Sequence, residues 1–220
     1  MKLKYFMQYV LLFFAALFFT LPIASAENFS AQEARIWANN KGQQILNIMT
    51  SINPEEKIKR LDEILYNDVD LDYAAQFAAG KYWRKMSAQQ QAQYSSLFKQ
   101  YTAALYKNYP LNLDKGEVAY TIDNVITQKE SQFVHCTIFI KALEQKVNDA
   151  SKGGIKVVFR LVKNNGKIQL RDLQIAESSF LRAYRERFYK MIYEDDDEEI
   201  DWFLEDLKQL IADMEKENTN

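Results

Sequence analysis

The chain has 220 residues, 28 basic and 30 acidic side chains, a formal net charge of −2 and a single cysteine. This balance argues against nucleic-acid binding, which favours a clustered basic surface. Cys136 alone cannot form an internal disulfide, so a packed core must hold the fold, and the length suffices for one domain with such a core.

The first residues predict a secretory signal peptide. Lys2 and Lys4 precede an apolar run at residues 10–19, and the small residues Ala-Ser-Ala at 24–26 form a cleavage site. A retained membrane anchor is the weaker alternative, because the apolar run is short and ends in that cleavage site. We therefore expect cleavage after Ala26, which leaves a single exported domain over residues 27–220.

Helical signals dominate the chain as far as residue 109. Ser30 and Glu33 form a capping box, and Asn53 is an N-cap residue followed by proline at the first helical position. Asp70 or Asp72 opens a third helix, which we expect to continue into the Tyr-Trp pair at 82–83.

A fourth helix is predicted after a second capping box, made by Ser87 and Gln90. Six large residues then recur at steps of three or four, with two adjacent pairs, which places all of them on one helical stripe. They are Tyr94, Leu97, Phe98, Tyr101, Leu105 and Tyr106.

The hydrophobic period then changes to two. Four strands are predicted at residues 118–126, 133–143, 155–162 and 168–175, with a hairpin turn at Asn164-Asn165-Gly166 between the last two. Helical spacing returns over residues 180–192 and 200–211. The predicted fold class is α+β, with N-terminal and C-terminal helices packed on a curled four-stranded antiparallel sheet that encloses an apolar cavity.

The sequence shows no convincing group of polar residues for catalysis or metal binding. His135 and Cys136 are neighbours on a predicted strand, so their side chains point to opposite faces and cannot form a dyad. A zinc site would need carboxylates in most positions. The acidic run at 194–199 lacks the central glycine of a calcium loop and is better interpreted as a solvated helix junction. We expect no catalytic residue and no metal site.

Residues 80–109 hold many aromatic side chains, most of them with a polar tip. For any single ring on a helical stripe, core packing is the more probable interpretation. Tyr and Trp at the mouth of a cavity can also meet water or a polar ligand group, which leaves an apolar-ligand pocket as the alternative. The residues with polar tips are Tyr82, Trp83, Tyr94, Tyr101, Tyr106 and Tyr109.

Two blocks of sequence carry a family resemblance. In "AAGKYWRKMSAQQQAQYSSLFKQYTAALY", Gly-x-Tyr-Trp-Arg is followed by Ser-x-x-Gln and a Phe-containing helix that ends in Tyr. In "VVFRLVKNNGKIQLRDLQIAESSFLRAYRERF", a strand, an Asn-Gly turn and a second strand precede Ser-x-x-x-x-Tyr-Arg-x-x-Phe. In this order and behind a signal peptide, the blocks resemble the MlaC-type family of periplasmic phospholipid-shuttle proteins, also described as toluene-tolerance or auxiliary transport components.

The resemblance implies a soluble periplasmic carrier that holds one phospholipid as cargo, with its acyl chains inside and its headgroup outward. Family members shuttle lipid between an outer-membrane lipoprotein complex and an inner-membrane ABC transporter with an MCE-domain lipid-binding ring, and so maintain outer-membrane lipid asymmetry. Such a carrier needs no cofactor and no catalytic residue. The aromatic stripe would form one wall of the acyl-chain cavity and the sheet the other.

The residues expected to line this cavity are Phe77, Trp83, Phe98, Tyr101, Leu105, Tyr106, Val157, Phe159, Phe180, Tyr184 and Phe188. Arg182 and Arg185 are candidates for a basic rim near a phosphate or a partner protein. Ordinary solvated helix charges are the alternative interpretation of these two arginines.

The chain departs from the family pattern after the last strand. Where the family usually has Glu-Gly, this chain has Ala176, Glu177 and Ser178. If glycine serves a positive φ there, Glu177 is expected to adopt another conformation.

Two rival functions stay open at this point. One is a small periplasmic enzyme on a cone-shaped α+β scaffold like that of nuclear-transport-factor-like proteins, which would need an ionisable pair such as Asp172 and His135 in its cavity. The other is an interaction module with a filled core.

Overall fold

The computed structural model describes residues 28–50, 53–107, 118–140, 154–194 and 200–217. The predicted signal peptide and residues 195–199 of the acidic run lie outside the described residues. Among the helices that are described, none has the length and apolar character needed to cross a membrane.

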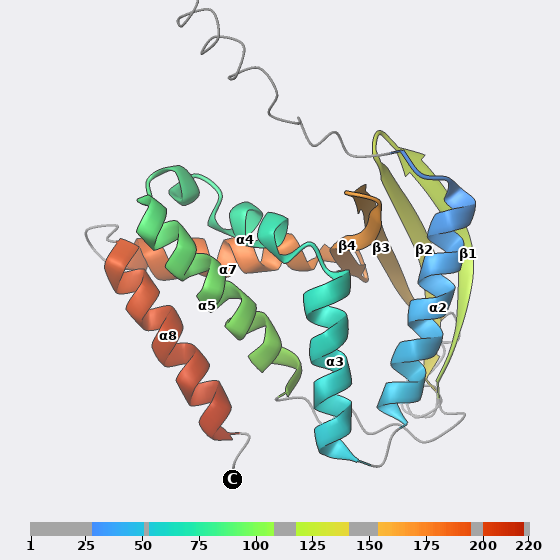
Figure 1. The fold of residues 1–220 in the computed structure, drawn as a ribbon, viewed down its shortest axis with the longest axis horizontal. Coiled ribbons are helices and arrows are strands. Elements are labelled where there is room, and N and C mark those ends of the chain that lie inside the picture. The colour runs from blue at the N-terminus through green and yellow to red at the C-terminus, as the bar shows by residue number, and fades with distance from the viewer. Residues whose placement is uncertain (1–27, 51–52, 108–117, 141–153, 195–199, 218–220) are drawn as a thin grey trace, which may run out of the picture.

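Helices surround one face and one end of the sheet (Figure 1). In chain order they are α2 (Ala31–Met49), α3 (Pro54–Asp68), α4 (Leu71–Ala79), the 3₁₀ turn η1 (Tyr82–Arg84), α5 (Ala88–Lys107), α7 (Phe180–Glu194) and α8 (Ile200–Glu217). Helix α2 lies along the sheet, α3 lies between α2 and α5, and α5 runs beside α8 (Figure 1).

The predicted helix starts are confirmed. Ser30 Oγ accepts a hydrogen bond from the Glu33 amide at 3.1 Å, and Glu33 Oε2 accepts one from the Ser30 amide at 2.8 Å. Ser87 and Gln90 repeat this exchange before α5, at 3.2 and 2.8 Å. Asn53 caps α3. These contacts join residues three positions apart, so the local sequence is enough to specify them.

Helix α4 begins at the cap of Asp70 and ends at Ala79, before the Tyr-Trp pair that was expected to continue it. Gly80 has a φ of 52°, which favours glycine. A Cβ at this position would also collide with the hydroxyl of Tyr189, which accepts a hydrogen bond from the Lys81 amide at 2.9 Å. The close approach of α7 therefore stops α4.

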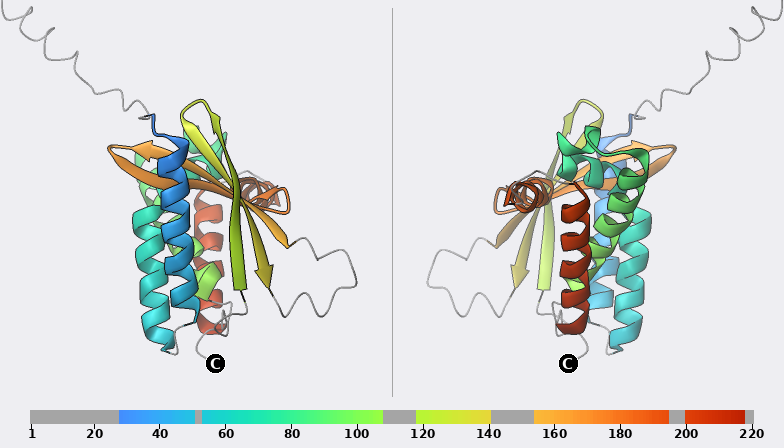
Figure 2. Two further views of the ribbon diagram at one scale, coloured as in Figure 1. Left: turned by 90° about the vertical axis from the view of Figure 1, so that its right-hand side faces the viewer. Right: turned by 90° about the vertical axis from the view of Figure 1, so that its left-hand side faces the viewer.

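The sheet is antiparallel and open, with its strands in sequence order. They are β1 (Val118–Gln128), β2 (Ser131–Ile140), β3 (Ile155–Asn164), β4 (Lys167–Ile175) and β5 (Ser178–Ser179). The sheet twists strongly, so that β4 runs across the direction of β1 (Figure 2). The α+β class is confirmed. The prediction of four strands is wrong, because the sheet has a fifth, short strand, β5, at its edge.

Strand β5 exists because the chain reverses within two residues after β4. Ala176 and Glu177 have φ values of 46° and 71°, and Ser178 pairs back with Ile175. Two consecutive positive φ values are typical of a tight hairpin turn, which usually uses Asn-Gly. The expectation for Glu177 is therefore wrong, since it takes the left-handed conformation itself. The predicted turn between β3 and β4 is confirmed, with Asn165 at 49° and Gly166 at 76°.

Replacing Glu177 with glycine should stabilise the protein. The left-handed conformation costs a side-chain-bearing residue about 1 kcal/mol, and glycine removes most of this penalty. We expect Glu177→Gly to raise the free energy of unfolding in urea by about 0.5–1 kcal/mol.

The matched control is Glu186→Gly, in the interior of α7 and equally exposed. There glycine should lower the free energy of unfolding by about 1 kcal/mol. A loss of stability in both variants would contradict the strain assigned to the turn.

Candidate functional site

Two hydrophobic cores form instead of one. The helical core joins α4, α5, α7 and α8, with Leu65 of α3 at its edge. The sheet core joins α2 to the sheet and contains Phe29, Ala34, Ala38, Val134, Cys136 and Leu161. The candidate site for an apolar ligand lies where these two cores meet.

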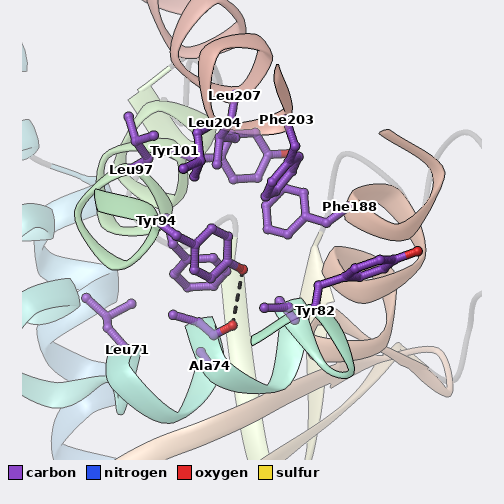
Figure 3. Close-up of a cluster of buried hydrophobic side chains, with 14 of the residues drawn as sticks. Leu71, Ala74, Tyr82, Tyr94, Leu97, Tyr101, Phe188, Phe203, Leu204 and Leu207 are labelled. Carbon is purple, nitrogen blue, oxygen red and sulfur yellow. Dashed lines mark hydrogen bonds between the residues drawn. The ribbon is translucent and has the colours of Figure 1, made fainter. Parts of the chain in front are cut away.

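The helical core is built around an aromatic cluster with Phe188 of α7 at its centre. The Phe188 ring centroid lies 5.5 Å from that of Tyr101 and 5.6 Å from that of Phe203. It lies 6.1 Å from the ring centroids of Tyr94 and Phe98. The interplanar angles are 59–84°, which bring ring edges against ring faces. Figure 3 shows Tyr94 and Tyr101 of α5, Phe188 of α7 and Phe203 of α8 converging.

The hydroxyl of Tyr94 is satisfied inside this cluster. It donates to the backbone carbonyl of Ala75 in α4 at 3.1 Å (Figure 3). Burial raises the pKa of Tyr94, and it raises the pKa of Tyr184 to about 12, so both hydroxyls stay protonated at neutral pH. The polar hydroxyl of Tyr94 therefore does not mark the mouth of a cavity, because it is hydrogen-bonded inside the core.

An apolar cavity of about 170 Å³ lies between the helical core and strand β4, and we call it the larger hollow. Its aromatic walls are Phe98, Phe180 and Tyr184. Its aliphatic walls include Leu65, Leu71, Ala74, Leu170, Leu173 and Leu181.

A second cavity of about 60 Å³, the smaller hollow, lies between α2, α3 and the sheet. Its walls include Trp37, Ile45, Ile64 and Phe159, and it shares Val69 and Leu170 with the larger hollow. The two hollows are therefore neighbours along the boundary between helices and sheet.

The acyl-chain cavity that the sequence predicted is not confirmed at the expected size. Pockets for drug-sized ligands are typically about 300–1,000 Å³, and the larger hollow is below that range. The reason lies in the aromatic stripe, because its rings pack against one another and leave no open wall along most of α5.

The residues expected to contact lipid fall into three groups. Phe98, Phe180 and Tyr184 line the larger hollow, and Phe159 lines the smaller one. Tyr101 and Phe188 are buried within the helical core, and the partly buried residues packed against that core are Phe77, Trp83, Leu105 and Tyr106. Val157 lies elsewhere, beside a polar groove on the sheet. Their contact with lipid stays a prediction.

The two rim arginines have different surroundings. Arg185 donates two hydrogen bonds to the carbonyl of Phe77, at 2.9 and 2.7 Å, and its guanidinium lies 3.7 Å from the Phe77 ring centroid. It thereby joins α7 to α4, and this contact uses two of the five N–H donors of its guanidinium. Arg182 is exposed near the start of α7.

Aliphatic wall residues were missed by the sequence analysis. Leu65 lies on the helix predicted after Asn53, and Leu170 and Leu173 lie on the last predicted strand, but none of them was assigned to a ligand wall. The alanine-rich face of α4, with Ala74, Ala75, Ala78 and Ala79 all buried, was a usable signal. Small side chains leave space against a neighbouring layer, whereas large ones fill it.

Asp172 and His135, the ionisable pair that the enzyme alternative would need, lie on strands that are not neighbours. Both carboxylate oxygens of Asp172 cap α7, accepting from Ser179 Oγ at 2.8 Å and from the Leu181 amide at 3.2 Å. His135 pairs with Val158, so β3 separates it from β4, which carries Asp172. Burial raises the pKa of the Cys136 thiol to about 11, and the charge of Asp123 adds to the rise.

The polar groove has a volume of about 490 Å³, larger than either hollow, and two of its charged side chains, Asp123 and Lys156, pair with each other. Asp123 accepts hydrogen bonds from Thr121 at 2.9 Å, Thr137 at 2.6 Å and Lys156 at 3.3 Å. These bonds lower the pKa of Asp123 and hold its carboxylate ionised at neutral pH. We interpret the groove as solvated sheet surface.

Comparisons with known proteins identify one family and one similar fold. The family model described as "MlaC protein" matches residues 39–209. The fold resembles the solved structure of a phospholipid-binding protein from Ralstonia solanacearum in complex with a phospholipid, with a TM-score of 0.64 at 16% sequence identity. That match covers 84% of this chain and 99% of the other. No curated protein matches the chain.

Phenylalanines in the core and at the hollow should respond differently to truncation. Phe188 is 0% exposed at the centre of the cluster, whereas Phe180 is 40% exposed at the wall of the larger hollow. We expect Phe188→Ala to lower the free energy of unfolding of the lipid-free protein by about 3–5 kcal/mol. Phe180→Ala should cost less than about 1.5 kcal/mol. Similar losses in both variants would contradict this division.

Cys136 should resist thiol reagents in the folded protein. Its thiol is 3% exposed, and its raised pKa keeps it protonated at pH 8. We expect Ellman's reagent to react only in denaturant, as the protein unfolds. Stoichiometric labelling of the native protein within minutes would show an accessible thiolate and would favour the enzyme alternative.

Proposed function

The chain belongs to the MlaC protein family, and we propose that it is a periplasmic carrier that holds the acyl chains of a phospholipid between its helices and its sheet. The observation that carries the proposal is the position of the larger hollow. Its walls are mostly apolar and combine residues of the helical core with residues of β4 such as Leu170, which packs against the sheet core. The polar residues among them, Thr102, Arg171 and Asp172, already have hydrogen-bond partners within the protein.

The solved structural neighbour supports phospholipid as the class of ligand. It has a similar fold over most of this chain and was obtained in complex with a phospholipid. At 16% sequence identity the likeness concerns the fold, so the wall residues are inferred from this chain alone. We infer that the boundary between helices and sheet is the ligand site of this protein.

The larger hollow must widen to hold such cargo. Burying a methylene group contributes about 0.8 kcal/mol, so roughly thirty in a diacyl lipid contribute on the order of 24 kcal/mol. A bilayer buries the same groups, so this free energy favours the loaded protein over lipid in water and not over lipid in a membrane. The same free energy makes free escape into water negligible, so a carrier must dock with proteins that accept the lipid directly.

We propose the partners of an outer-membrane lipid-asymmetry system. These are an inner-membrane ABC transporter with an MCE-domain lipid-binding ring and an outer-membrane lipoprotein complex. Delivery between two membranes requires export, which is the role proposed for the signal peptide at residues 1–26.

Carrying lipid requires no catalytic group, and we propose that the protein is not an enzyme. The capping role of Asp172 and its separation from His135 support this proposal, since the pair would have to be rebuilt to transfer a proton. Phospholipid is cargo in this mechanism rather than a cofactor.

The direct test is to purify the native protein without detergent, extract it with organic solvent and identify the released lipid by mass spectrometry. A carrier should release phospholipid at about one molecule per chain. Protein that is consistently empty, even after incubation with phospholipid vesicles, would contradict the proposal and favour an interaction module.

Filling the larger hollow should reduce its lipid content. Ala74 is buried in α4 and lines this hollow, so Ala74→Leu adds apolar volume where an acyl chain would lie. We expect the extracted phospholipid per chain to fall several-fold, while the lipid-free protein unfolds at an unchanged or higher temperature because the cavity is filled.

The matched control is Ala92→Leu, at an exposed position of α5. It makes the same chemical change on the helical layer away from the hollow and should retain the wild-type lipid content. Equal lipid content in both variants would place the acyl chains elsewhere.

A further inference from the structure

The segment that joins α3 to α4, residues 68–70, separates the larger hollow from the smaller one. Val69 and Leu170 line both hollows and form a parallel β-bridge with each other. The Asp70 amide donates to the Leu170 carbonyl at 2.9 Å. A short backbone contact between a helix junction and β4 thus forms the partition between the hollows.

The side chain of Asp70 strengthens this contact. Its Oδ2 accepts hydrogen bonds from Arg171 Nε at 3.0 Å, from Arg171 Nη2 at 2.8 Å and from Asn164 Nδ2 at 3.1 Å. The Arg171 guanidinium also lies 4.3 Å from the ring centroid of Tyr73 in α4. We call these contacts between the α3–α4 junction and the sheet the Asp70 clasp.

A local irregularity of the sheet places Arg171 in the clasp. The register between β3 and β4 shifts between Arg160 and Leu161, so that Arg160 pairs with Asp172 and Leu161 with Leu170. Arg171 is left as the extra residue of a β-bulge, and bulges re-aim side chains. Asp70 and Arg171 are both nearly buried, with 12% and 13% of their side-chain surfaces exposed.

The clasp also differs in kind from the contacts that hold each core. When the clasp separates, its polar groups can replace their hydrogen bonds to each other with hydrogen bonds to water. No polar group of the clasp is then left without a partner. Separating the rings around Phe188 would instead expose apolar surface. The boundary between the two cores should therefore open at the clasp before either core loosens.

We propose that the Asp70 clasp is the gate of the apolar chamber. When the clasp is closed, the chamber is divided into hollows of about 170 and about 60 Å³. When the junction leaves Leu170, the two hollows join and an apolar chain can enter or leave. The identity of that chain as the acyl chain of a phospholipid rests on the proposed function, whereas the gate itself does not.

The first test weakens the clasp by a minimal change. Asp70→Asn keeps a good N-cap for α4 but removes the charge that Arg171 pairs with. We expect a fluorescent phospholipid to move from the loaded variant to phosphatidylcholine vesicles about tenfold faster than from the wild type, the ratio that corresponds to about 1.4 kcal/mol in the barrier.

The matched control is Asp72→Asn, the same substitution two residues further along. Asp72 is 75% exposed and pairs with Lys99 on the surface at 2.9 Å. Exposed pairs of this kind contribute little, so its transfer rate should stay within about twofold of the wild type.

The second test locks the clasp. Bridge partners on neighbouring strands lie about 5 Å apart, within the range that a disulfide spans, so Val69→Cys combined with Leu170→Cys should cross-link on oxidation. We expect transfer to slow by about tenfold or more in the oxidised protein, and to recover on reduction. The reduced form is the control for the two substitutions.

The outcomes separate the gate from the carrier function. Equal transfer rates in the wild type, Asp70→Asn and both redox states of the cross-linked variant would overturn the gate and leave the carrier intact. If the purified protein holds no phospholipid, the gate is judged by uptake of anilinonaphthalenesulfonate into the cross-linked variant. Uptake that is blocked on oxidation and recovers on reduction supports the gate, and equal uptake in both states, zero included, overturns it.

Discussion

The mutual packing of the rings around Phe188 is the constraint on which the rest of this structure depends. It occupies the inner face of α5 and fixes α7 and α8 against it, so that the helical layer has a core of its own. The sheet builds a second core with α2. The candidate ligand site lies at the boundary between the two, where the side chains of the described residues leave space unfilled.

This division explains the character of the walls. The larger hollow is lined mainly by leucines and a small residue of α4, with aromatic rings from the margin of the cluster. Widening it requires the layers to part, and the ring cluster can remain intact while they do. The polar clasp at Asp70 and the helix cap at Asp172 are the contacts that tie the layers together across this boundary.

Local features were well predicted from the sequence. The caps at Ser30, Asn53 and Ser87 and the hairpin turn at Asn165 depend on residues two or three positions apart, and all are confirmed. The strands were recognised from their alternation, which reports that one face is buried. The turn at Glu177 failed as a prediction because the flanking strands impose a positive φ that its side chain does not favour.

Most of the helices and strands, the faces that they bury and, through two sequence blocks, the family of the chain could be predicted from the amino-acid sequence. Tertiary packing was needed to show that Tyr101 and Phe188 lie in a core while Phe180 and Leu173 line a hollow. The periodicity of apolar residues indicates which side chains are buried on folding. The free energy of that burial is nearly the same whether the neighbour is another side chain or a ligand. The distinction depends on how two layers meet, and no local pattern contains that information.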